Sequence, residues 1–169
     1  LTGKEIERSG LFHGYYNESA YPLFHFGHGL SYTEFDYQSL RISPSSLLIT
    51  EKVEISFTVE NTGDFDGQEV VQLYLFDREA HTTRPVKSLA GFRKLLLKKG
   101  ESRKVTFTLD PRQLATLDME MKLCVESGNF DVMIGSSSND IRLKGSFQIG
   151  GEKTYLDNRQ VFFSQCEVE

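Results

Sequence analysis

Acidic residues between positions 64 and 69 are of a type that could bind a metal ion. Asp64, Asp66 and Glu69 surround Gly67, and carboxylate oxygens are ligands that calcium prefers in flexible loops. A complete calcium loop needs further oxygen ligands and a closing bidentate acid, which this stretch lacks. Because Asp and Gly are also typical turn residues, the stretch predicts a long turn, with a calcium loop as the alternative.

His25 and His28 are a second pair of candidate metal ligands. A structural zinc site almost always takes four ligands, and Cys124 and Cys166 lie far from both histidines in the sequence. His13 is the other candidate nearby. We therefore expect the histidines to pack or to form hydrogen bonds, both cysteines to be free thiols, and the chain to bind no metal and no cofactor.

Aromatic residues and glycines are most concentrated between residues 21 and 33, which we call the joint segment. Their spacing matches neither a helix nor a strand, and the glycines allow backbone angles that are closed to other residues. So many apolar groups would be costly in water unless they packed against a surface. The segment is therefore predicted to be a buried interdomain joint, formed by Tyr21, Phe24, Phe26, Gly27, Gly29, Leu30 and Tyr32.

The segments that follow the joint segment have the pattern of short β-strands. Apolar and polar residues alternate over residues 53–60, and similar segments separated by turn residues continue to residue 149. This pattern predicts an all-β fold, an antiparallel immunoglobulin-like or fibronectin-III-like sandwich of seven or eight strands, with a small barrel as the alternative. The residues expected between the two sheets are Val53, Ile55, Phe57, Val59, Leu73, Leu75, Val105, Phe107, Phe130, Val132, Ile134 and Phe147.

Two local signals refine this pattern. The alternation changes phase at residues 38–39, which predicts a β-bulge in the first strand. Asp110 followed by Pro111 predicts the start of a short helix, with Asp as the N-cap and Pro at the first helical position.

The overall charge argues against a nucleic-acid partner. The formal net charge is −5, whereas nucleic-acid-binding domains are basic. No apolar run approaches the ~20 residues needed to span a bilayer, so we expect no membrane partner. A basic run is expected to form the solvated face of a β-hairpin, and consists of Arg84, Lys87, Arg93, Lys94, Lys98, Lys99, Arg103 and Lys104.

Four segments in order resemble a known family. Residues 22–35 read Pro-Leu-Phe-His-Phe-Gly-His-Gly-Leu-Ser-Tyr-Thr-Glu-Phe. The others are Val-Val-Gln-Leu-Tyr-Leu at 70–75, Arg-Pro-Val-Lys-Ser-Leu-Ala-Gly-Phe at 84–92 and Gly-Asn-Phe-Asp-Val-Met-Ile-Gly at 128–135. From about Glu7 to Ile149, the chain resembles the C-terminal fibronectin-III-like domain of family-3 glycoside hydrolases, the β-glucosidases and β-xylosidases.

The resemblance implies an organisation in three parts. Residues 1–34 would be the end of a preceding α/β domain and the joint, residues 35–149 the sandwich, and residues 150–169 a C-terminal tail outside the match. The chain begins at Leu1 rather than Met, so we expect it to be part of a longer polypeptide of unknown compartment. Without the upstream domain, we expect the joint segment to fold onto the sandwich or to meet a second copy as a homodimer.

The resemblance also implies a function. Family members take their aspartate nucleophile from an N-terminal barrel and their acid/base glutamate from the α/β domain, so we assign no catalytic residue here. The chain would be a non-catalytic accessory domain that braces the catalytic domains of an enzyme acting on β-glucosides or β-xylosides. The alternatives are a carbohydrate-binding module, for which Tyr74 and Tyr155 are the candidate rings, and an interaction domain of an unrelated surface protein.

This assignment predicts that the isolated chain hydrolyses no aryl β-glucoside or β-xyloside above background. The reason is that glycoside hydrolysis needs two carboxyl groups held at a fixed separation, and neither catalytic motif of the family is present. The measurement is release of the aryl group by purified protein. Turnover that disappears when one acid of this chain is replaced would contradict the assignment.

Overall fold

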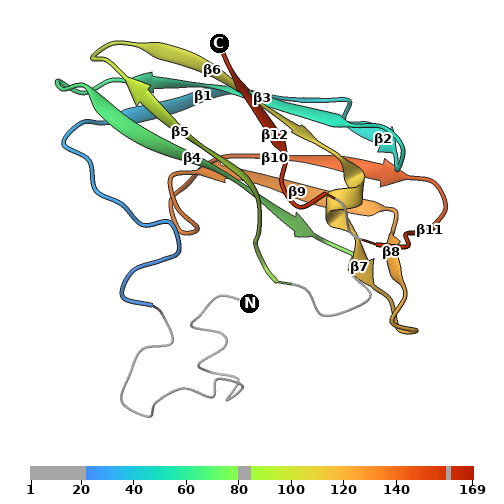
Figure 1. The fold of residues 1–169 in the computed structure, drawn as a ribbon. Coiled ribbons are helices and arrows are strands. Elements are labelled where there is room, and N and C mark those ends of the chain that lie inside the picture. The colour runs from blue at the N-terminus through green and yellow to red at the C-terminus, as the bar shows by residue number, and fades with distance from the viewer. Residues whose placement is uncertain (1–21, 80–84, 159–160) are drawn as a thin grey trace.

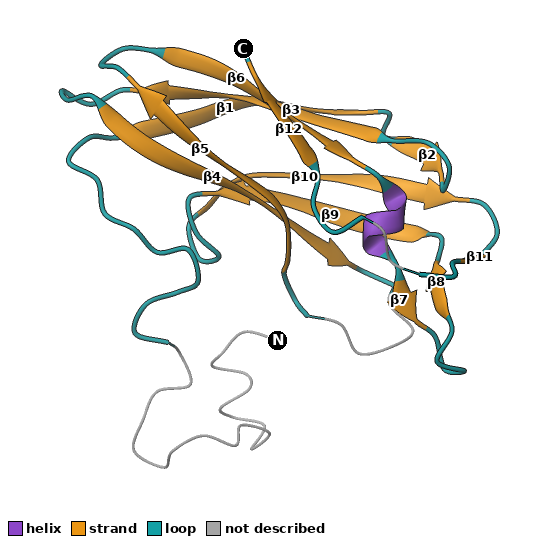
Figure 2. Cartoon of the chain, viewed as in Figure 1, coloured by secondary structure: helices purple, strands orange, loops and turns teal. Residues whose placement is uncertain are grey.

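Two antiparallel sheets packed face to face form most of the fold (Figures 1 and 2). The computed structural model describes residues 22–79, 85–158 and 161–169. The smaller main sheet has four strands in the order β1-β3-β6-β12. These strands are β1 (Phe35–Ser43), β3 (Val53–Asn61), β6 (Ser102–Leu109) and β12 (Gln165–Val168).

The larger sheet has five strands in the order β2-β10-β9-β4-β5. Its strands pair in antiparallel fashion except at the β2–β10 edge, where the pairing is parallel. The strands are β2 (Ser46–Leu48), β10 (Ile141–Gly150), β9 (Gly128–Gly135), β4 (Gly67–Asp77) and β5 (Ser88–Leu97).

A third, small sheet lies at one end of the sandwich, in the order β11-β8-β7. Its strands are β7 (Thr116–Leu117), β8 (Leu123–Val125) and β11 (Thr154–Tyr155). A 3₁₀ helix, η1 (Pro111–Leu114), precedes β7, and the Asp110 carboxylate accepts a hydrogen bond from the backbone N–H of Arg112 at 3.0 Å. The predicted helix start with its Asp cap is therefore confirmed.

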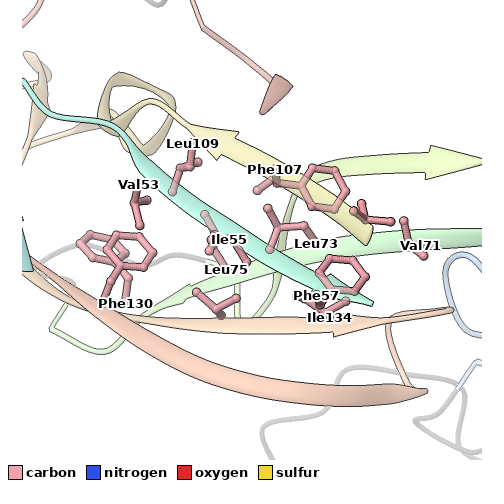
Figure 3. Packing of buried hydrophobic residues seen from close by; sticks show 14 of the residues in the cluster. Val53, Ile55, Phe57, Val71, Leu73, Leu75, Phe107, Leu109, Phe130 and Ile134 are labelled. Atoms are coloured by element: carbon pink, nitrogen blue, oxygen red, sulfur yellow. The ribbon is translucent and has the colours of Figure 1, made fainter. Parts of the chain in front are cut away.

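The core lies between the two main sheets (Figure 3). Each residue that the alternation placed between the sheets is buried. Ring pairs cross this core, with Phe57 and Phe107 centroids 6.1 Å apart and Phe130 and Phe147 centroids 5.5 Å apart. The sandwich prediction is therefore confirmed, and so is the bulge in β1, where the register shifts between Gln38 and Arg41.

The strand count differs from the prediction. The described residues form twelve strands rather than seven or eight, and two of them come from the tail that the sequence left unplaced. In that tail, Gln165 to Val168 pair with β6, and the Ser164 backbone N–H donates to the Ala90 carbonyl of β5 at 2.8 Å. The tail therefore supplies the edge strand β12 of the smaller sheet and contacts the edge strand β5 of the larger sheet. No helix in the described ranges has the length and hydrophobicity of a membrane span.

The packing predicts a large cost for removing a central ring. Phe57→Ala or Phe107→Ala should lower the free energy of unfolding by about 3–5 kcal/mol, because each leaves a cavity among fully buried neighbours. Phe65→Ala is the matched control, since its ring is exposed, and should cost under about 1 kcal/mol. Denaturant unfolding measures the unfolding free energy of the core variants and of the control. A core variant that loses no more stability than the control would contradict the packing of these rings in the sandwich core.

Candidate functional site

The joint segment lies over the outer face of the larger sheet, and its backbone is bound there. In Figure 1 it leaves the start of β1 and runs past the side of β4 that faces away from the smaller sheet. The Ser138 N–H, in the β9–β10 turn, donates to the Phe26 carbonyl at 2.9 Å. Farther along, Gln72 Nε2 of β4 donates to the Gly27 carbonyl at 3.4 Å. The segment is therefore attached through main-chain groups.

Gln72 is the centre of this attachment. Its side chain is buried, although it points to the outer face of the sheet. Besides Gly27, its Nε2 atom donates to the Ser136 carbonyl at 2.5 Å, and its Oε1 atom accepts from the Tyr74 hydroxyl at 2.5 Å. A buried amide is costly unless its donors and acceptor are paired. Gln72 therefore joins β4, the β9–β10 turn and the joint segment.

Gly27 allows this close approach. Its φ angle is +78°, in the left-handed region, and an added Cβ would lie 2.3 Å from Gln72 Oε1. A side chain at this position would be strained and would displace the amide. Gly29 differs, because nothing lies within 4 Å of the Cβ it would carry. Of the two glycines that the sequence singled out, Gly27 is the one whose lack of a side chain the contact requires.

A second buried group fixes the end of the joint segment next to β1. The Thr33 hydroxyl donates to Asn61 Oδ1 at 2.7 Å, and both residues are buried. Asn61 Nδ2 in turn donates to the carbonyls of Phe65 and Leu97 at 2.8 and 3.0 Å. The segment is thus held both at Gly27 and at Thr33, which restricts the residues between them.

The apolar side chains of the joint segment do not follow its backbone onto the sheet. Their exposed fractions run from 65% for Phe26 to 98% for Tyr32. Of the two expected outcomes, burial of these side chains on their own sandwich is therefore contradicted for the described residues, and contact with a second copy of the chain stays a prediction. The physical reason is that the sheet surface here binds main-chain carbonyls through polar groups. Tyr21 lies outside the described residues, and the exposed side chains are Leu23, Phe24, Phe26, Leu30 and Tyr32.

The neighbouring strand adds further apolar groups on the same side of the sheet. Phe92 is paired with Gln72 across β5 and β4, and Leu96 with Gln68, so these side chains share the outer face. Both Phe92 and Leu96 are exposed. A groove of about 900 Å³ lies between the joint segment and this face. We call the combined surface the docking face, formed by Leu23, Phe24, Phe26, Leu30, Tyr32, Phe92 and Leu96.

A buried acid lies among the residues that line this groove. The Tyr37 hydroxyl donates to Glu69 Oε1 at 2.8 Å, and both side chains are buried. The Arg142 guanidinium lies 4.9 Å from the Tyr37 ring centroid and pairs with Asp140 at 2.8 Å. Burial raises the pKa of Glu69, since a charged carboxylate loses hydration there, although the Tyr37 hydrogen bond and Arg142 oppose the shift.

The residues proposed for metal binding do not converge. Asp64 pairs with the Lys99 ammonium at 2.7 Å, and Asp66 accepts from the Lys99 N–H at 2.9 Å, so both acids stabilise the contact with the β5–β6 turn. The predicted turn is confirmed as far as Asp66, and β4 begins at Gly67, so Glu69 lies in the strand and its side chain points toward Tyr37. In the described part of the chain, no three His, Cys, Asp or Glu side chains are grouped as a metal site would require.

The remaining candidates also have defined surroundings. The His28 ring lies 5.2 Å from that of Phe24, whereas His13 lies outside the described residues. Cys124 is buried and Cys166 is half-buried, and no disulfide joins them. The described residues of the basic run are exposed, as a solvated face requires, and they are Lys87, Arg93, Lys94, Lys98, Lys99, Arg103 and Lys104.

The two candidate sugar-binding rings do not form an exposed row. Tyr74 is buried, with its hydroxyl on Gln72, so this candidate ring of the carbohydrate-binding alternative offers no exposed face. Tyr155 is half exposed, and the ammonium groups of Lys122 and Lys153 lie 5.9 and 5.6 Å from its ring centroid. Cations therefore occupy the space near the one candidate ring that solvent reaches.

The buried acid predicts a pH dependence of stability. A raised native pKa means that the folded chain binds the Glu69 proton more tightly than the unfolded chain does. This contribution is fully present below the ordinary pKa of 4.5 and is lost as the pH rises through the native pKa. Glu69→Gln should therefore become more favourable relative to wild type as the pH rises above 4.5.

Urea unfolding across this pH range measures the difference in unfolding free energy. Glu54→Gln, at an exposed position of β3, is the matched control and should follow the wild-type curve. A Glu69→Gln difference that stays constant with pH would show that Glu69 does not titrate in this window.

Comparison with known proteins connects this fold to one family. Residues 69–138 match the model of the fibronectin type III-like domain. The chain is 42% identical to thermostable β-glucosidase B of Acetivibrio thermocellus over 146 residues, covering 84% of this chain and 19% of that protein. It is 43% identical to a putative β-xylosidase of Formosa agariphila over 128 residues, covering 76% of this chain and 17% of that protein.

Solved structures give the same result. A β-glucosidase of Listeria innocua superposes with a TM-score of 0.78 at 32% identity, covering 88% of this chain and 20% of that one. β-Glucosidase 3B of Thermotoga neapolitana superposes with a TM-score of 0.73 at 36% identity, covering 80% and 18%. The chain thus spans about a fifth of the length of the relatives it matches. It belongs to the fibronectin type III-like domains that form the C-terminal part of family-3 β-glucosidases and β-xylosidases.

Proposed function

We propose that this chain is the non-catalytic accessory domain of a larger glycoside hydrolase acting on β-glucosides or β-xylosides, and that it braces the catalytic domains through the docking face. The single observation that carries this proposal is the exposure of the joint segment. The Gly27 carbonyl is bound to β4 of the larger sheet and the Thr33 hydroxyl to Asn61 of β3 in the smaller sheet, yet the apolar side chains of the segment face solvent. Such an arrangement fits a surface that a neighbouring domain covers.

The energetic argument follows from the number of exposed groups. Burying each large apolar side chain is worth roughly 1.5–3 kcal/mol, so covering the docking face would strongly favour one position of the neighbouring domain. A flexible segment would lose conformational entropy on docking, whereas this one is already ordered by its hydrogen bonds. The relatives support the identity of the neighbour, because roughly four fifths of their length lies outside the match.

The rival occupant of the docking face is a second copy of the chain. Analytical ultracentrifugation distinguishes the two cases, with one version of the chain starting at Leu1 and another at Ser31. Under the bracing proposal, both versions sediment as monomers at micromolar concentration, because the natural occupant is the catalytic part of the same polypeptide. A dimer formed only by the longer version would instead identify a homodimer through the joint.

The proposal predicts that the docking face stabilises the intact enzyme and not the isolated domain. The changes Phe24→Ser, Leu30→Ser and Tyr32→Ser together should lower the unfolding free energy of the polypeptide that carries this chain by about 1.5 kcal/mol or more per side chain. The same changes should leave the isolated chain nearly unaltered, since these side chains are already exposed there.

Calorimetry of the intact polypeptide and of the isolated chain supplies this comparison. Leu48→Ser and Phe65→Ser are matched controls, because both side chains are exposed outside the docking face. The proposal would be overturned if the three serine substitutions in the joint segment left the melting temperature and the activity of the intact enzyme unchanged.

A further inference from the structure

The β7–β8 hairpin presents a second set of exposed apolar side chains. It projects from one end of the sandwich (Figures 1 and 2). At its tip, Met119 is 90% exposed and Met121 is 73% exposed. Single exposed apolar residues are ordinary, but two methionines on one short turn form an apolar tip that calls for a physical account.

The tip is ordered by the side chain of Asp118. Its Oδ1 atom accepts from the N–H groups of Glu120 and Lys122 at 2.9 and 3.0 Å. Across the turn, the Asp118 N–H donates to the Lys122 carbonyl at 3.0 Å, and the Met121 N–H donates to the Asp118 carbonyl at 3.0 Å. The carboxylate thus holds the backbone of the turn at Glu120 and Lys122.

Ion pairs with a neighbouring lysine hold the Asp118 carboxylate in place. Lys153 Nζ lies 3.1 Å from Asp118 Oδ2 and 3.1 Å from Glu126 Oε1. Hydrogen bonds from the turn and the neighbouring ammonium lower the pKa of Asp118 to about 2. The turn therefore keeps its charged anchor at any pH above about 4, and the tip is attached to β8 and to the segment before β11.

Met121 adopts a backbone conformation that its side chain disfavours. Its φ angle is +62°, in the left-handed region where glycine and asparagine are preferred. A turn needs only that backbone shape, which glycine would supply with less strain. An exposed methionine in this position is therefore better explained by what its side chain contacts than by the fold of the turn.

The hairpin tip and the joint segment leave the sandwich on the same side. In Figure 1 both extend beyond the larger sheet, away from β1 and β3, at opposite ends of the molecule. A partner that covers the docking face from that side would come to lie beside the hairpin as well. The two surfaces are thus placed for a single large neighbour.

We propose that the hairpin tip is a second docking point, which inserts Met119 and Met121 into an apolar recess of the catalytic part of the same polypeptide. This inference rests on the proposed bracing function and adds a specific contact to it. Methionine suits the role, because its unbranched, polarisable side chain adapts to irregular apolar surfaces.

The size of the tip favours a tethered partner over a separate protein. A stable interface between free proteins buries about 1,200–2,000 Å² in total, far more than two methionines provide. Within one polypeptide, the joint segment already holds the two surfaces together, so the second contact forms at a high effective concentration. A small apolar tip is sufficient under those conditions.

Hydroxyl-radical footprinting compares the isolated chain with the intact polypeptide that carries it. We expect the oxidation rates of Met119 and Met121 to fall at least fivefold in the intact polypeptide, with free methionine added to both samples as the dose reference. The rings of Phe24 and Tyr32 report on the joint segment in the same experiment.

The outcomes separate this inference from the proposed function. Protected rings with unprotected methionines would overturn the hairpin contact and leave the bracing function standing. Rings and methionines that are all unprotected would overturn both. Protected methionines with exposed rings would support the hairpin contact and contradict the role of the joint segment.

A pair of variants tests the contribution of the side chain itself. Met121→Gly removes the side chain and suits the left-handed backbone, so the isolated chain should keep or raise its melting temperature. In the intact polypeptide, Met121→Gly combined with Met119→Glu should lower the melting temperature by several degrees. Leu48→Glu, which adds a charge at an exposed position in β2, is the matched control. A double variant that behaves like this control in the intact polypeptide would overturn the inference.

Discussion

The side-chain amide of Gln72 joins three parts of the chain that are distant in sequence. Its partners belong to β4 itself, to the turn after β9 and to the joint segment, which lies 45 residues earlier. The opposite face of β4 is filled by Val71, Leu73 and Leu75 in the core. From Val71 to Leu75, β4 is therefore buried on both sides, by apolar packing within the sandwich and by hydrogen bonds outside it. The position of the joint segment depends on this second, polar layer.

Polar attachment explains why the apolar side chains remain outside. Carbonyl groups of the joint segment are paired with Gln72 and with the Ser138 N–H, so its backbone carries little penalty on the sheet. Its rings would have to displace these bonds to reach the same surface. The sequence therefore separates two tasks within one segment, because the backbone fixes the position while the side chains remain available to a neighbour. A positive φ at Gly27 is the local condition for this arrangement.

Local patterns predicted the sandwich because its strands follow rules of short range. The alternation in β3 and β6, the bulge near Gln38 and the cap at Asp110 each depend on a few neighbouring residues. Strand β12 could not be predicted in this way, since Gln165–Val168 lacks a strong pattern and depends on the edge of β6. The same limit applies to Tyr74. Its position in an apolar run indicated a strand, but only the fold shows that Gln72 and its neighbours bury the ring.

The exposed surfaces share a physical property beyond being apolar, since hydrogen bonds order the backbone of each. At the joint segment, Gln72 and Asn61 supply this order, and at the hairpin tip Asp118 supplies it. Ordering a loop in its bound conformation removes part of the entropic cost of docking. Two ordered contacts at opposite ends of a sheet also restrict rotation, which one contact alone leaves free. In the proposed bracing role, two such contacts would limit the motion of this domain relative to its neighbour.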